Sequence, residues 1–307
     1  MISRKPLLIL VLILSNSLLV ACSSNTLQLK PQPIASNLYN DQKALIHDMA
    51  ENPPNAASNI KRADGFYQQG NMNDALYYYV KSLELDDKNK EVLERIGQIH
   101  VKKGNYDLAE AAYSLVLKLD KNNAQALEGL GIIQLNTGKP AEANQSLRAA
   151  VAIDASLWQA NNGLGLIADK QGDYSSASQY YEAALKTKPN MPMLLNNLGY
   201  SKYLSGNYLG AIQLFDSASK VDAKYESSWL NLGLVYARQG NDTAALEAFM
   251  HVLNEADAYN NLGYIDMMND KTNAANEYFQ KAISLSPSYH ILANENLKRL
   301  RSSEKLL

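Results

Sequence analysis

Small and large apolar residues recur along the chain with a period of 34 residues from about residue 56 onward. Alanine lies five residues after each glycine of one periodic series, and a large apolar or aromatic residue follows four positions later. Residues three or four apart lie on one face of a helix, so the pattern predicts amphipathic helices. The first glycine series is Gly70, Gly104, Gly138, Gly172, Gly206 and Gly240, and the second is Gly97, Gly131, Gly165, Gly199 and Gly233.

Each unit is predicted to be a pair of antiparallel helices, A and B. A first-series glycine can end helix A in the left-handed conformation of a C-cap, and the Asn or Asp that often follows favours the turn into helix B. A second-series glycine lies inside helix A, where it costs roughly 1 kcal/mol relative to alanine. We therefore expect helix B to approach closely there, with a large side chain such as Tyr113 or Phe215 beside the glycine.

A 34-residue period is that of the tetratricopeptide repeat, and the chain resembles this family over about residues 56–289. The resemblance implies an all-α solenoid, a right-handed superhelix of antiparallel helix pairs. The interval from Gly233 to Gly263 is only 30 residues, and we expect the loop between the last two repeats to vanish there. The predicted repeats are 56–89, 90–123, 124–157, 158–191, 192–225, 226–255 and 256–289.

The segments that flank the repeats have their own patterns. Residues 290–303 are amphipathic at helical period and are predicted to form a C-terminal capping helix over the last repeat. Residues 22–40 are polar and without period, which is typical of a flexible tether. A short helix is also predicted at 41–55, ahead of the first repeat.

Residues 1–21 have the order of a secretory signal peptide. Arg4 and Lys5 precede an apolar run from Leu7 to Leu14, and Leu19-Val20-Ala21-Cys22 follows. These last four residues resemble the bacterial lipobox, which implies cleavage before Cys22 and a diacylglycerol anchor on its thiol. Ser23 comes next, and in such lipoproteins the lack of Asp there implies transfer to the outer membrane, where we expect the chain on the periplasmic face. The alternative is an ordinary signal peptide with an incidental cysteine.

Composition argues against several classes of function. The 29 Lys and Arg residues nearly cancel the 31 Asp and Glu residues, so no basic field exists to attract nucleic acid. One cysteine and four scattered histidines provide no metal-ligand spacing. The sequence has no GxSxG or HExxH motif. We therefore expect no catalytic residues, no metal and no cofactor, and we predict that the protein is not an enzyme.

Helix A lines the inner, concave surface in tetratricopeptide arrays. Its residues that face away from helix B therefore form the expected groove for protein partners. Asparagine recurs there, two residues before the glycine at Asn197, Asn231 and Asn261 and three before it at Asn162, Asn196 and Asn260. An amide donates and accepts, so an evenly spaced row could hold an extended peptide. Apolar contacts are expected from Tyr200, Tyr203, Tyr264, Met267 and Met268. The alternative is that these amides cap or pack locally.

The C-terminal repeat supports a finer resemblance. The residues that resemble the TadD lipoproteins of the tight-adherence (Flp) pilus are Tyr259-Asn260-Asn261-Leu262-Gly263-Tyr264, Ala274-Ala275, Tyr278-Phe279, Leu285-Ser286-Pro287-Ser288-Tyr289 and Ala293-Asn294-Glu295-Asn296-Leu297. This implies a role in assembling the pilus or its outer-membrane secretin, with the secretin or another pilus component as the partner. Three alternatives are a type IV pilus pilotin, a periplasmic scaffold that docks peptidoglycan hydrolases and proteases, and an enzyme with a cryptic site.

Overall fold

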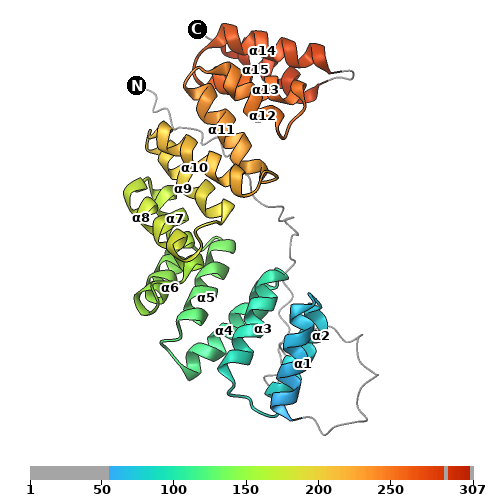
Figure 1. Ribbon diagram of the computed structural model, residues 1–307, viewed down its shortest axis with the longest axis vertical. Coiled ribbons are helices and arrows are strands. Elements are labelled where there is room, and N and C mark those ends of the chain that lie inside the picture. The colour runs from blue at the N-terminus through green and yellow to red at the C-terminus, as the bar shows by residue number, and fades with distance from the viewer. Residues whose placement is uncertain (1–54, 287–289, 305–307) are drawn as a thin grey trace. The chain divides into compact units, whose positions relative to one another are not determined.

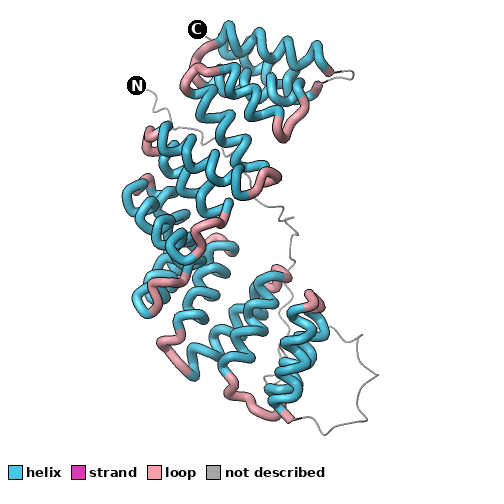
Figure 2. The backbone as a smooth tube through the Cα atoms, viewed as in Figure 1, coloured by secondary structure: helices cyan, strands magenta, loops and turns pink. Residues whose placement is uncertain are grey.

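The computed structural model describes residues 55–286 and 290–304, and every regular element in this part of the chain is a helix (Figure 2). All of these helices belong to one compact unit. The predicted signal peptide (1–21), the tether (22–40) with Cys22, and the predicted helix at 41–55, apart from its last residue, lie outside the described residues. Among the helices that are described, none combines the length and the apolar character that a membrane span requires.

Helices pair into hairpins in chain order, with odd-numbered helices α1 to α13 as helix A and even-numbered helices as helix B (Figure 1). Each hairpin contacts the next, and α15 packs on α13 and α14. The bounds are α1 Ala56–Gln68, α2 Met72–Leu83, α3 Lys90–Lys102, α4 Tyr106–Leu119, α5 Ala124–Asn136, α6 Pro140–Ile153, α7 Trp158–Gln171, α8 Tyr174–Thr187, α9 Pro192–Leu204, α10 Tyr208–Val221, α11 Glu226–Arg238, α12 Asp242–Met250, α13 Glu255–Met268, α14 Thr272–Leu285 and α15 Ile291–Glu304.

Left-handed glycines close helix A, as the sequence predicts. The six first-series glycines have φ between 73° and 81°. Asn or Asp commonly caps the helix B that follows, for example Asn207, whose side chain accepts a hydrogen bond from the backbone N–H of Gly210. In the seventh hairpin Asp270 takes the place of the glycine, with φ of 60°. This is a conformation that costs energy for any residue with a Cβ.

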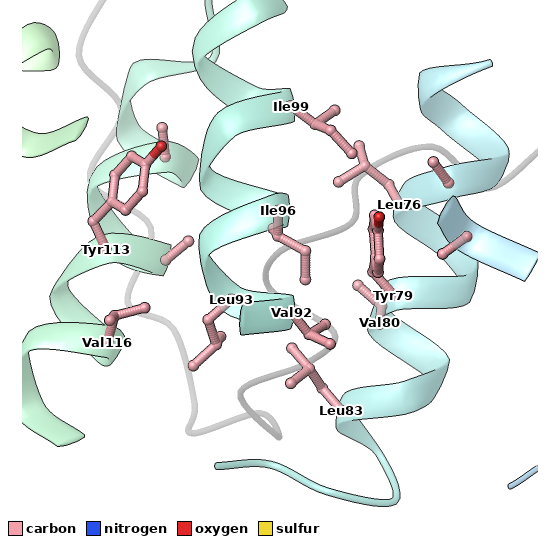
Figure 3. Close-up of a cluster of buried hydrophobic side chains, with 14 of the residues drawn as sticks. Leu76, Tyr79, Val80, Leu83, Val92, Leu93, Ile96, Ile99, Tyr113 and Val116 are labelled. Atoms are coloured by element: carbon pink, nitrogen blue, oxygen red, sulfur yellow. The ribbon is translucent and has the colours of Figure 1, made fainter. Parts of the chain in front are cut away.

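Glycine inside helix A packs directly against the large residue of helix B, which confirms the predicted close approach. A Cβ on Gly165 would lie 2.5 Å from the Tyr181 ring, and one on Gly199 would lie 2.7 Å from the Phe215 ring. The same packing extends between hairpins, because helix B also contacts the helix A that follows it. Figure 3 shows this for the first core cluster, where α3 lies between α2 and α4, with Leu76, Tyr79, Val80, Leu83, Val92, Leu93, Ile96, Ile99, Tyr113 and Val116 labelled.

The sixth hairpin departs from the sequence prediction. Its helix B, α12, has nine residues, whereas the other helices B have 12 to 14. Residues 251–254 still join it to α13, so the predicted loss of the loop is wrong and the helix is shortened instead. Helix α13 begins directly after Asn254, whose side chain caps it by accepting from the backbone N–H of Asp257. A four-residue connection before this cap is kept, so the shorter repeat is accommodated by the earlier end of α12 at Met250.

Candidate partner-binding surface

Residues four apart lie on one face of a helix, so each helix A from α7 to α13 presents a row that starts three residues before its buried glycine. The predicted asparagine and tyrosine positions fall on this row or beside it. We define the helix-A strip as Asn162, Leu166 and Lys170 of α7, Asn196, Tyr200 and Leu204 of α9, Leu230, Leu234 and Arg238 of α11, and Asn260, Tyr264 and Met268 of α13.

At the first position of the strip, Asn162 and Asn196 accept hydrogen bonds from asparagine amides on the next helix A. Asn197 Nδ2 donates to Asn162 Oδ1 at 2.9 Å, and Asn231 Nδ2 donates to Asn196 Oδ1 at 2.8 Å. Asn196 and Asn231 are buried, with 8% and 6% of the residue surface exposed. These amides therefore bridge neighbouring hairpins, which is the local packing role that the sequence left open as an alternative.

A third amide pair joins the capping helix to the last hairpin. Asn296 Nδ2 of α15 donates to Asn260 Oδ1 of α13 at 3.1 Å, and both residues are buried. The sequence pattern did not place Asn296 among the groove residues, although it follows Asn261 at a distance of 35 residues, close to the repeat period. Asn261 itself is half-buried on α13. Contact of any of these amides with a partner stays a prediction.

The amide pairs do not extend over the whole array, and side-chain size explains where they stop. Gly129 and Gly163 stand at the donor position in the third and fourth hairpins, and a Cβ on Gly129 would lie 2.3 Å from the Tyr113 ring. On the preceding helix A, Glu128 stands at the acceptor position that would face residue 163. Its carboxylate instead accepts from the backbone N–H of Ala160 at 2.8 Å. Burial raises the pKa of this carboxyl, although the hydrogen bond from Ala160 opposes the rise.

Tyr200 and Tyr264 occupy the middle position of the strip on α9 and α13, and Tyr203 lies beside it. Tyr200 and Tyr203 of α9 are half-buried with ring centroids 5.8 Å apart, and Tyr203 lies at the same distance from Tyr208. Burial raises the pKa of both Tyr200 and Tyr203 above the ordinary value of a tyrosine. Tyr264 and Met267 pack partly against the cluster formed by α14 and α15. These side chains thus divide their surface between the core and the solvent.

Large apolar side chains on the strip are exposed to solvent. Leu166 is 46% exposed, Leu204 is 36% exposed and Met268 is 41% exposed. Leu166 lies one turn beyond Asn162, and Leu204 one turn beyond Tyr200, so both could have been found from the helical spacing of the residues that the sequence did single out. Exposed apolar side chains gathered along one face are typical of a protein-binding surface.

Buried carboxylates near the strip are engaged in local contacts. Asp169 Oδ2 of α7 accepts from the Tyr181 hydroxyl at 2.9 Å, and burial raises the pKa of Asp169. Asp266 of α13 is fully buried with Lys271 Nζ 3.1 Å away, and burial raises its pKa against the opposing effect of the lysine. No group of three or more His, Cys, Asp or Glu residues suited to a metal ion occurs within residues 55–286 and 290–304.

Comparison with sequence families decides what kind of array this is. Two profiles described as Tetratricopeptide repeat match the chain, one at residues 60–124, 94–157, 129–192, 162–222 and 196–261, and the other at residues 256–289. The chain belongs to the tetratricopeptide repeat family. The predicted fold class, an all-α tetratricopeptide-repeat solenoid, is confirmed. In this family the fold typically serves as a protein-interaction scaffold, so the partners of a tetratricopeptide repeat protein such as this one are proteins.

Solved tetratricopeptide structures share the fold. PilW, described as a widely conserved type IV pilus biogenesis factor, is 21% identical, with 63% of this chain and 90% of that chain covered and a TM-score of 0.57. PilF of Pseudomonas aeruginosa is 19% identical, with 74% and 97% covered and a TM-score of 0.56. A tetratricopeptide repeat protein of Parabacteroides merdae is 18% identical, with 80% and 98% covered and a TM-score of 0.54. Comparison with curated protein sequences gives no match.

Proposed function

We propose that this tetratricopeptide repeat protein is a lipid-anchored scaffold on the periplasmic face of the outer membrane, and that it helps to assemble a tight-adherence (Flp) pilus or its secretin. The observation that carries the binding role is the exposure of Leu166, Leu204 and Met268 on equivalent faces of helices A. A partner segment with apolar side chains would cover them and gain roughly 25 cal/mol for each Å² of apolar area removed from water.

The membrane anchor is supported by the sequence around Cys22. A lipobox cysteine after an apolar run gives the chain a thiol for diacylglycerol, and several acyl chains hold a protein to a bilayer far more firmly than one. The polar residues of 22–40 would let the folded hairpins reach a partner away from the lipid surface.

Assembly of a pilus is supported by two separate likenesses. The residues of the seventh repeat resemble the TadD lipoproteins, and the solved structure of PilW, a type IV pilus biogenesis factor, has the same fold. The second likeness also favours a related candidate function, in which the chain acts as a type IV pilus pilotin. Both candidates place a secretin or another pilus component on the helix-A strip.

Site-specific photo-crosslinking in a host that carries the pilus genes tests this proposal. A photoreactive amino acid at Leu204 should capture the secretin or another pilus component in the outer-membrane fraction. The matched control is Ser217 of α10, which is exposed on a helix B of the same hairpin and should capture little. Capture of peptidoglycan hydrolases at Leu204, or equal capture of one protein from both positions, would show that the proposed function is incorrect.

A further inference from the structure

A cavity of about 380 Å³ lies between α10 and α12, the helices B on either side of α11. Trp229, Leu232 and Tyr236 of α11 line it, and their spacing places them on one helix face. Leu230, Leu234 and Arg238 of the helix-A strip follow a different row on the same helix, on the opposite side. The cavity is therefore separate from the proposed partner-binding surface.

Two aromatic rings form one wall of this cavity in a fixed arrangement. The Trp229 ring stacks on the His251 ring with centroids 3.7 Å apart and an interplanar angle of 12°. The Trp229 indole N–H also donates to the backbone oxygen of Ala223 at 3.0 Å, which holds the ring in place. His251 is the C-cap of the shortened helix α12, so the early end of this helix brings the imidazole onto the indole.

The charged groups of the cavity are acidic. Asp216 of α10 and Glu247 of α12 line it, and no Lys or Arg is among the lining residues. Asp216 pairs with Lys220 at 2.6 Å, but both side chains are well exposed to solvent, so water and other cations compete for this contact. No hydrogen bond or ion pair involves the Glu247 carboxylate within the described parts of the chain.

We propose that this cavity is a second binding site, which takes the guanidinium group of an arginine side chain from a protein partner. Aromatic faces attract a cation through their quadrupole, and guanidinium stacks on such rings while its N–H groups bond a carboxylate. Glu247 supplies a carboxylate without a cation, Asp216 supplies a second one, and Trp229 and Tyr236 supply the rings. The volume of about 380 Å³ lies at the small end of the range of ligand sites and suits one long side chain.

Fluorescence of Trp229 provides a direct measurement of arginine binding in the cavity. The chain has two tryptophans, so Trp158→Phe leaves Trp229 as the only indole. The full-length variant in detergent is titrated with acetyl-Gly-Arg-Gly-amide and with the matched peptide that has citrulline, an uncharged analogue, in place of arginine. We expect a saturable change with the arginine peptide and binding of the citrulline peptide that is weaker by about tenfold or more, because charge-assisted hydrogen bonds are roughly twice as strong as neutral ones.

A pair of glutamate variants in the same background localises the bound peptide. Glu247→Gln should weaken binding of the arginine peptide by about tenfold, since one charge-assisted bond is lost. Glu277 of α14 occupies the same repeat position and is exposed, so Glu277→Gln should leave the affinity unchanged. Circular dichroism of each variant verifies that the helices are retained. Equal responses to the two peptides, equal effects of the two variants or no saturable change would each show that the cavity is not an arginine-binding site. None of these results would bear on partner binding at the helix-A strip.

Discussion

Asn231 of α11 donates its side-chain amide to Asn196 of α9 across 2.8 Å, in a place where both residues are almost fully buried. This bond joins two hairpins that are neighbours in the array. A buried amide without a partner is costly, so the pair is worth more to the array as a matched set than either residue is alone.

Asn231→Ala is expected to destabilise the protein by about 1 to 3 kcal/mol, because the buried Asn196 oxygen would lose its donor. Asn197→Ala removes the equivalent donor to Asn162, but both of those residues are half-buried and water can replace the amide. Urea unfolding followed by circular dichroism should therefore show a smaller loss for Asn197→Ala. Equal losses would contradict the bridging role assigned to the buried pair.

Two glycines inside helices A should respond to alanine in opposite directions. Gly165→Ala places a Cβ 2.5 Å from the Tyr181 ring and should cost about 1 to 3 kcal/mol through overpacking. Gly65→Ala in α1 meets no atom within 4 Å and should stabilise its helix by up to about 1 kcal/mol. Thermal melting of the two variants provides the measurement, and a loss at Gly65 as large as that at Gly165 would rule out the packing explanation.

Replacement of Asp270 measures the free-energy cost of holding a residue with a Cβ in the left-handed conformation. Asp270→Gly should stabilise the protein by about 1 kcal/mol, since φ of 60° is free of steric cost only for glycine. Asp222, the C-cap of α10, has φ of −142°, so Asp222→Gly has no such strain to relieve and should not stabilise. The comparison needs only the two melting temperatures, and a gain for both variants would point to an effect of charge instead.

Leu204→Glu should abolish most partner binding while changing stability little, because this side chain is partly exposed on the helix-A strip. Leu209→Glu in α10 is the matched control, since Leu209 is more exposed yet lies on a helix B. Recovery of the pilus component with each affinity-tagged variant measures the effect. If both variants recovered it equally, the helix-A strip would not be the binding surface.

Cys22→Ser should leave the protein without its lipid anchor, because the thiol is the proposed attachment point of the diacylglycerol. Metabolic labelling with a palmitate analogue should mark the native chain and not the variant. Membrane fractionation should recover the variant as a soluble or unprocessed species. Equal label on the variant and the native chain would show that Cys22 is not the site of lipid attachment.

The repeat register and the packing of Gly165 against Tyr181 could be predicted from the sequence, because the same steric rule applies locally in each hairpin. The partner of an asparagine could not. Asn231 has the same pattern whether its amide faces a ligand or a neighbour, and its partner Asn196 lies 35 residues away. Nor could the sequence decide which element loses the four residues between Gly233 and Gly263. In the structure the connection 251–254 is kept and α12 ends early, at Met250.

Leu230 stands where Asn196 and Asn260 supply acceptors in the adjacent hairpins, so no amide bridge can form from α11 to α13, and α12 is a turn shorter. In a linear array, stability is approximately the sum of each hairpin's own free energy and its coupling to its neighbours. Coupling should therefore be weaker at this junction than at the two before it, where Asn197 and Asn231 form amide bridges, although the Tyr278 hydroxyl still donates to Asp242 Oδ2 across it. The segment α13 to α15, closed internally by the Asn260 and Asn296 pair, would then open as one unit, and its backbone amides would exchange with solvent together, before those of α7 to α11.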